Sequence, residues 1–177
     1  MKFFENVLSH DTLLSYFKEI KSLLHHYSRW APSDIRWQEP LRKYVPGTCL
    51  CTSASKELKL SILNDIQLSL PFANAERVVI QHYVWLKNSG INWHEDGKYS
   101  YGATIYLNKG WDANYGGIFV WKDSNQKRVG KLNAYSPVFN SMVLNDQHND
   151  HLVTMVSPFA PENRFTLQIW GLQQKDK

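Results

Sequence analysis

A histidine and an aspartate stand two residues apart in the segment Trp93-His94-Glu95-Asp96-Gly97. In extended backbone, side chains at i and i+2 point to the same face. His94 and Asp96 could therefore hold one metal ion between them, with Glu95 turned to the opposite face. Such a pair is common by chance, so the hypothesis depends on a third ligand elsewhere in the chain.

Two histidines further along the chain are candidates for that ligand. His151 begins an alternating apolar segment that predicts a strand over residues 151–156. His148 lies in the polar stretch 145–150, which is typical of an exposed turn. A ligand at the start of a strand is held rigidly, so we prefer His151. Two imidazoles and one carboxylate on one face form the facial triad of non-haem Fe(II) sites.

The chain has 177 residues, enough for one domain with a substantial core, and we expect 1–177 to form a single domain. Its net charge of +4 is not concentrated in any Lys/Arg run, which disfavours a nucleic-acid partner. No apolar run approaches the roughly 18 residues of a membrane span. The N-terminus has no signal-like apolar region, so a cytoplasmic location is expected.

The sequence changes character near residue 77. Residues 1–76 predict a helical and irregular support region, with helices over 13–27 and 56–70 and irregular chain over 32–56. Ser9 or Asp11 would cap the first helix. Trp37 could form the rim of a pocket or pack over the core, and packing is the preferred interpretation. The two cysteines, Cys49 and Cys51, are too close to pair and are expected as thiols on one face of a short strand.

Residues 77–171 predict a β-rich core. Short strands are expected at 77–85, 101–107, 118–121, 138–144, 151–156 and 164–170. The chain is therefore expected to be mainly β with N-terminal helices, as an antiparallel barrel or sandwich with the helices packed against it.

Arg164 begins the last predicted strand and shares a face with Thr166, Gln168 and Trp170. A guanidinium inside a barrel needs an anion, because an unpaired buried charge is costly. Its planar fork fits a carboxylate. Arg164 could bind a dicarboxylic acid, pair with an acidic residue of this chain, or face solvent.

Five sequence blocks occur together in this chain. They are His94-Glu95-Asp96, Ile105-Tyr106-Leu107-Asn108-Lys109-Gly110-Trp111-Asp112-Ala113, Gly116-Gly117, His151 and Arg164-Phe165-Thr166-Leu167-Gln168-Ile169-Trp170. In order and spacing they resemble the Fe(II)- and 2-oxoglutarate-dependent dioxygenases of the prolyl 4-hydroxylase type, and most closely the oxygen-sensing prolyl hydroxylases of animals. The resemblance covers residues 78–170. It implies a double-stranded β-helix (jelly-roll, cupin-like) barrel over 77–171.

The resemblance also implies roles for individual residues. The implied iron ligands are His94, Asp96 and His151; the implied 2-oxoglutarate residues are Arg164 and Tyr106, with Tyr83, Thr104 and Gln168 in the pocket wall; Phe119 and Trp170 would be apolar lining. Trp85, Trp93 and Trp170 are candidates for substrate contact. The cosubstrates would be 2-oxoglutarate and O2, with ascorbate as a possible stimulant.

The implied reaction is hydroxylation of a C–H bond, with release of succinate and CO2, on a prolyl residue of a peptide or protein. A free amino acid or another small molecule is the first alternative. A nucleic-acid demethylase and a non-catalytic cupin-like binding protein are further alternatives, the last of which should lack a ligand or the arginine. The gap from His151 to Arg164 is longer than is usual in the family, and its two prolines predict an enlarged hairpin loop that leaves the strand register intact.

Overall fold

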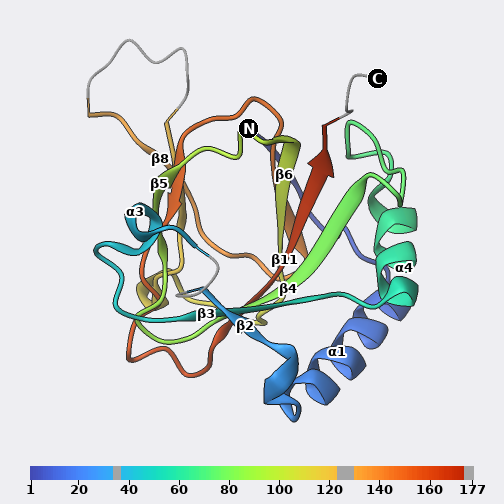
Figure 1. The fold of residues 1–177 in the computed structure, drawn as a ribbon, viewed down its shortest axis with the longest axis horizontal. Helices are drawn as coiled ribbons and strands as arrows, with labels where there is room; N and C mark the ends of the chain where they lie inside the picture. Colours follow the sequence, from blue (N-terminus) through green and yellow to red (C-terminus); the bar gives the residue numbers. More distant parts are fainter. Residues whose placement is uncertain (34–36, 123–129, 174–177) are drawn as a thin grey trace.

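Two antiparallel β-sheets lie opposite each other in the computed structural model, which describes residues 1–33, 37–122 and 130–173 (Figure 1). Within these residues the larger sheet has seven strands, in the order β1 (Lys2–Phe4), β9 (Ser141–Asn145), β6 (Tyr99–Tyr106), β11 (Arg164–Leu172), β4 (Val78–Trp85), β3 (Cys49–Ser53) and β2 (Ala31–Pro32). The smaller sheet has the order β5 (Ile91–His94), β10 (His151–Val153), β7 (Phe119–Trp121) and β8 (Asn133–Tyr135).

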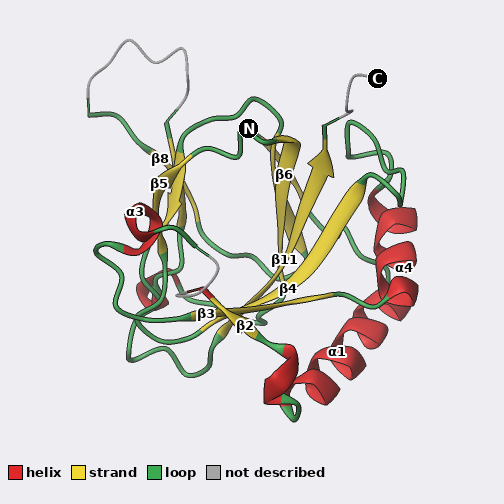
Figure 2. Cartoon of the chain, in the orientation of Figure 1, coloured by secondary structure: helices red, strands yellow, loops and turns green. Residues whose placement is uncertain are grey.

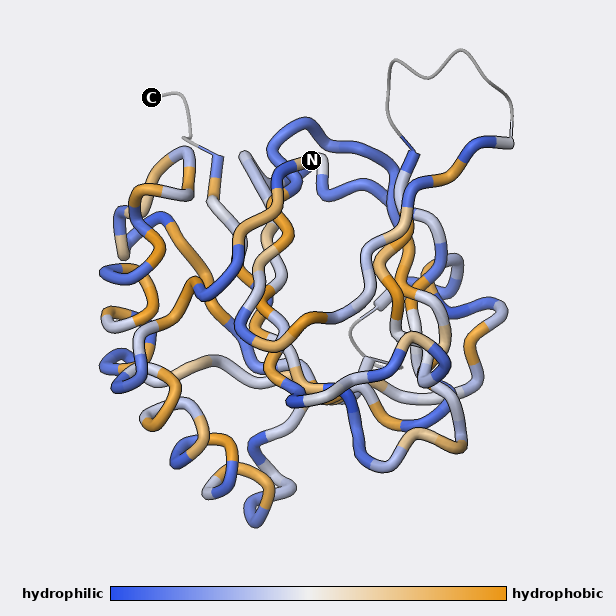
Figure 3. Tube along the Cα trace, turned by 180° about the vertical axis from the view of Figure 1, so that it is seen from behind, coloured by the Kyte–Doolittle hydropathy of each residue, from blue (hydrophilic) through white to orange (hydrophobic). Residues whose placement is uncertain are grey.

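Two helices cover the outer face of the larger sheet (Figure 2). Helix α1 (His10–Leu24) begins after Ser9, whose hydroxyl accepts a hydrogen bond from the Thr12 amide at 3.3 Å. Helix α4 (Lys56–Ile66) is capped in the same way by Ser55. Hydrophobic and hydrophilic residues alternate along both helices (Figure 3), as expected for a helix that packs one face on a sheet and exposes the other. None of the helices in the described residues combines the length and apolarity that a bilayer crossing requires.

Shorter helical segments connect these elements. They are η1 (Tyr27–Arg29), α3 (Glu39–Arg42) and η2 (Ala113–Tyr115). Helix α3 packs beside β5, and the side-chain amide of Asn92 in β5 donates to the Pro40 carbonyl at 2.9 Å. This contact brings a segment from the N-terminal region against the smaller sheet.

The central strands of the larger sheet separate two apolar clusters. On β4, Ile80 and Val84 face the helices, whereas Tyr83 and Trp85 face the space between the sheets. This division follows from the alternation of side chains along a strand. The inner face of the larger sheet is thus available to line a cavity, while its outer face packs against the helices.

The structure confirms the fold class, a mainly β protein with N-terminal helices and two antiparallel sheets. The prediction for residues 32–56 was wrong in part, because β3 runs through Cys49–Ser53 and pairs with β4. Cys49 and Cys51 are buried thiols on one face of β3, as expected. Strand β8 had no counterpart among the predicted strands, and β10 ends at Val153, earlier than predicted.

Glu19 of α1 joins the helices to the sheet. Its Oε1 lies 2.8 Å from Nε2 of the buried His82 on β4 and accepts the Ser55 amide at 2.9 Å. Burial raises the pKa of Glu19, but the hydrogen bonds from His82 and Ser55 outweigh it and lower the pKa from 4.5 to about 2. The ionised carboxylate therefore stabilises the folded chain.

Replacing this carboxylate should reduce stability in a pH-dependent way. For Glu19→Gln we expect the free energy of unfolding at neutral pH to fall by about 2 kcal/mol, the scale of hydrogen bonds to a charged group. A lowered pKa contributes fully above the ordinary value and is lost as pH falls through the folded value. The difference from wild type should therefore shrink between pH 4.5 and about 2. Urea unfolding across this range measures it, and the exposed Glu76→Gln is the control, expected to show no such trend.

Candidate active site

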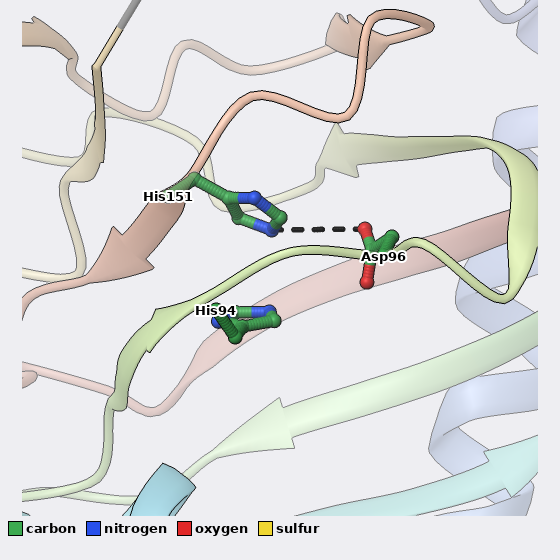
Figure 4. Close-up of side chains that lie close together, drawn as sticks. All are labelled: His94, Asp96 and His151. Carbon is green, nitrogen blue, oxygen red and sulfur yellow. Dashed lines mark ion pairs between the residues drawn. The ribbon is translucent and has the colours of Figure 1, made fainter. Parts of the chain in front are cut away.

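His94, Asp96 and His151 meet at the edge of the smaller sheet (Figure 4). His94 is the last residue of β5, Asp96 follows in the loop to β6, and His151 is the first residue of β10, paired with His94 in the register. One ligand atom from each side chain lies within 4.8 Å of the other two. His151 Nε2 is 3.7 Å from Asp96 Oδ2. Of the two candidate histidines, the structure places His151 in this cluster and not His148.

Both histidines are oriented by a backbone carbonyl two residues earlier in the chain. His94 Nδ1 lies 2.7 Å from the Asn92 oxygen, and His151 Nδ1 lies 3.0 Å from the Asn149 oxygen. A carbonyl only accepts, so each Nδ1 carries the hydrogen and each Nε2 keeps its lone pair for a metal. Burial, and then the neighbouring His151, lower the pKa of His94. Its ring is therefore held neutral, the form that binds metal.

The surroundings of the triad limit how its members can move. The ring of Phe119 stacks on that of His151 with 5.0 Å between centroids. Gly102 on β6 lies against Asp96, and a Cβ at that position would be 2.5 Å from Asp96 Oδ2. Glycine at 102 therefore leaves the space that the carboxylate occupies.

A cavity of about 680 Å³ adjoins the triad. Its volume falls within the range of roughly 300–1,000 Å³ that is usual for small-molecule sites. An aromatic wall runs along it, with ring centroids 5.7 Å apart for Trp37–Trp85 and Tyr83–Trp170 and 5.5 Å for Tyr99–Trp170. Polar lining comes from Gln81, Glu95, Lys98 and Gln168, and the triad residues form part of the same lining. The cavity thus joins a metal-binding set to an apolar surface.

Arg164 is fully buried at the start of β11, and its guanidinium lies between two aromatic rings. Its Cζ is 5.2 Å from the ring centroids of both Trp85 and Tyr106. Within the described residues, Nε, Nη1 and Nη2 of Arg164 and the hydroxyl of Tyr106 have no hydrogen-bond partner. Burial lowers the pKa of Arg164 and raises that of Tyr106, which keeps the phenol protonated. These groups are buried donors that lie close together, and their chemistry fits a carboxylate.

Asn108 explains why the long loop before β11 leaves the register intact. Its Nδ2 donates to the Asn163 carbonyl at 2.8 Å, and its Oδ1 accepts from the Phe165 amide at 2.6 Å. These two bonds flank Arg164 and hold it at the start of the strand. The register of β11 with β4 and β6 is then continuous up to Gly171.

The other predicted pocket residues divide into two groups. Tyr83, Trp85 and Trp170 line the large cavity, and Thr104 and Gln168 line a second space of about 20 Å³ beside Asp96 and His151. Thr104 donates to the Gln168 side chain. Arg164 and Tyr106 do not line the large cavity, whereas Trp85, which lies against the Arg164 guanidinium, does.

Trp93 is not among the residues that line the cavity in the described chain. It alternates with His94 along β5, so its ring points away, and Lys122 Nζ lies 4.2 Å from its centroid. Trp37 and Leu41 also line the cavity. Packing over the core was preferred for Trp37, with the rim of a pocket as the alternative, and sequence reasoning missed Leu41. An aromatic in an irregular, proline-containing segment carries no periodic signal that would locate it.

The family profile described as "2OG-Fe(II) oxygenase superfamily" matches residues 78–171, more than half of the chain. The chain belongs to this superfamily. Membership and the His-Asp-His triad together imply Fe(II) and 2-oxoglutarate, and the donor set at 94, 96 and 151 and the unpartnered guanidinium at 164 fit those two groups. Among curated protein sequences, none matches the chain.

Solved structures share this fold at low identity. A Pseudomonas putida prolyl-4-hydroxylase is 16% identical, with 97% of this chain and 92% of that chain covered and a TM-score of 0.67. A Trichoplax adhaerens prolyl hydroxylase, in complex with a hypoxia inducible factor oxygen degradation domain peptide fragment, is 14% identical, with 97% and 82% covered and a TM-score of 0.61. The non-heme alpha ketoglutarate dependent epimerase SnoN from nogalamycin biosynthesis is 10% identical, with 96% and 77% covered and a TM-score of 0.64.

A methyl group at position 102 should disturb metal binding. In Gly102→Ala the new Cβ displaces the Asp96 carboxylate, so we expect the affinity for Mn(II) to fall by about tenfold or more. Calorimetric titration of the metal-free protein measures this affinity. Gly97→Ala is the matched control, because its Cβ would meet only the Glu95 side chain, at 3.6 Å. Equal affinities in the two variants would contradict the role given to Gly102.

Proposed function

We propose that this oxygenase hydroxylates a prolyl residue in a peptide or protein, using Fe(II) held by His94, Asp96 and His151 and 2-oxoglutarate held at Arg164. One observation carries the proposal: the metal-binding triad shares the barrel interior with a buried guanidinium that has no acidic partner in the described residues. A non-catalytic binding protein of this fold would have no need to keep both features.

Arg164 and Tyr106 would bind the distal carboxylate of 2-oxoglutarate. The guanidinium offers two parallel N–H donors, and the buried phenol offers a third donor. The carboxylate would accept the hydrogen bonds that these groups can no longer make to water once they are buried. Thr104 and Gln168 would line the path from there to the triad. When bound, Fe(II), 2-oxoglutarate and O2 supply an oxidation that inserts oxygen into a substrate C–H bond and releases succinate and CO2.

Trp85 would have to yield some space to the cosubstrate. It lines the cavity, donates its indole N–H to Thr166 Oγ1 at 3.0 Å and lies against the Arg164 guanidinium. Trp85 therefore lies at the end of the pocket where 2-oxoglutarate would bind. Of the three tryptophans considered for substrate contact, Trp170 therefore has the best position, because it lines both the large cavity and the small space beside the triad.

The aromatic wall favours a prolyl substrate. A pyrrolidine ring is compact and apolar and packs well against indole and phenol faces. The similarity to prolyl hydroxylases, one of them bound to a peptide, supports this choice. A free amino acid is the alternative, and the polar residues of the cavity lining, among them Glu95 and Lys98, are the feature that favours it.

Succinate formation tests the activity. Purified protein with Fe(II), 2-oxoglutarate, ascorbate and O2 should release succinate, and His94→Ala should reduce the rate to background because it removes an iron ligand. A library of proline-containing peptides and a set of free amino acids, followed by mass spectrometry for one added oxygen atom, then separates the two substrate classes. Equal succinate release by wild type and His94→Ala would refute the proposal.

Arg164→Met should separate cosubstrate binding from stability. Loss of one partner of a buried charge pair costs on the order of 2–5 kcal/mol in binding, so the KM for 2-oxoglutarate should rise by roughly 30-fold or more. Without 2-oxoglutarate the guanidinium is a buried charge that has no counter-ion among the described residues, and an apolar replacement should leave the melting temperature equal or higher.

Arg77 provides the control for this experiment. It also lies over an aromatic ring, with Cζ 4.3 Å from the Phe72 centroid, but outside the cavity. Arg77→Met should leave the KM for 2-oxoglutarate unchanged. A large loss of stability in Arg164→Met would instead indicate that Arg164 has a structural partner.

A further inference from the structure

The turn that leads into His151 is clamped by a buried side chain. Asn145, the last residue of β9, is 3% exposed. Its Oδ1 accepts the Asn149 amide at 3.0 Å, and its Nδ2 donates to the Asn149 carbonyl at 3.0 Å. One amide side chain thus satisfies both backbone groups of a residue four positions later and closes the turn between β9 and β10.

The clamped carbonyl is the one that orients His151. The Asn149 oxygen receives the hydrogen of His151 Nδ1 at 3.0 Å, and Asn145 Nδ2 itself lies 3.4 Å from that nitrogen. The side-chain amide can have only one orientation here, because the flipped one would set two oxygens against each other and two N–H groups against each other. Contacts therefore run from Asn145 through Asn149 to Nδ1 of His151, which leaves Nε2 to face the triad.

The two histidines differ in what holds their orienting carbonyls. The Asn92 carbonyl behind His94 belongs to β5, which is paired with β10 on both sides of it, at Ile91–Val153 and at His94–His151. The Asn149 carbonyl lies in a turn outside any strand, next to His148 in left-handed backbone with φ of 52°. There the Asn145 side chain bonds both backbone groups of Asn149 and so holds that carbonyl in place.

We infer that Asn145 is a positioning residue for the metal site, which it serves without touching the metal. It holds the Asn149 carbonyl so that His151 keeps its hydrogen on Nδ1 and presents Nε2 to the triad. Asn145 also lines the small space that contains Asp96 and His151, so its loss would loosen the same corner. This inference rests on the metal site of the proposed function.

Metal titration of matched variants tests the inference. Asn145→Ala should weaken Mn(II) binding to the metal-free protein by about 10- to 100-fold, the usual effect of losing a partner of a metal-binding histidine. Asn145→Ser, whose hydroxyl can restore one of the two bonds, should fall between alanine and wild type. It also provides a foldable variant if alanine is too disruptive.

Asn140, just before β9, offers a matched control. It is buried, and its side chain clamps the backbone of Leu8 in the same two-bond manner, at 2.9 and 3.0 Å, away from the triad. Asn140→Gly suits its left-handed backbone, with φ of 58°, and should lower stability but leave Mn(II) affinity as in wild type. Equal weakening in the 140 and 145 variants would overturn the inference, because it would indicate general destabilisation.

A second measurement does not depend on metal or turnover. Nitrogen–proton correlation NMR of the metal-free protein at alkaline pH reports which ring nitrogen of each histidine carries the hydrogen. Wild-type His151 should carry it on Nδ1, and Asn145→Ala should give a mixture while His94 is unchanged. An unchanged His151 tautomer together with unchanged Mn(II) affinity refutes the positioning role. Failure of the wild-type protein itself to bind Mn(II) would instead refute the metal site of the proposed function.

Discussion

Strand β11 is hydrogen-bonded along its length to β4 on one side and to β6 on the other. Because side chains alternate along a strand, this one register decides which residues enter the barrel. Arg164, Thr166, Gln168 and Trp170 face inward, opposite Trp85, Tyr83, Gln81 and Val79 of β4. A slip of one residue would turn the guanidinium outward and bring Phe165 and Leu167 into the cavity. The Asn108 bonds at the start of β11 protect the molecule from that slip.

The proposed metal ligands and the proposed carboxylate-binding groups belong to different sheets. His94 and His151 come from the smaller sheet, whereas Arg164 and Tyr106 come from the larger one. Facing sheets pack about 10 Å apart, so 2-oxoglutarate bound as proposed would lie between the two layers and contact both sets of groups. The two sets would then depend on the spacing of the sheets, and each sheet is held together by its own strand pairing.

Much of this arrangement follows from the sequence, because its signals are local. The spacing of His94 and Asp96, the strand start at His151 and the parity of β11 each depend on neighbouring residues. The structure brings the three predicted ligands together. The role of Trp37 could not be predicted in this way, since its position depends on how an irregular segment packs on β4. Trp93 was assigned to the pocket because it adjoins His94, but adjacency along a strand places two side chains on opposite faces. The link from Asn145 to His151 depends on a turn whose geometry no periodicity specifies.

The segment that contains Trp37, Pro40 and Leu41 forms one side of the cavity but contributes no strand to either sheet. It is attached there by ring contacts to Tyr83 and Trp85 and by the bond from Asn92 to the Pro40 carbonyl. Evolution or protein engineering could therefore substitute residues of this segment while the strands that carry the triad keep their pairing. In such a barrel, substrate specificity can evolve at a different rate from the oxidising chemistry, because different parts of the chain determine them.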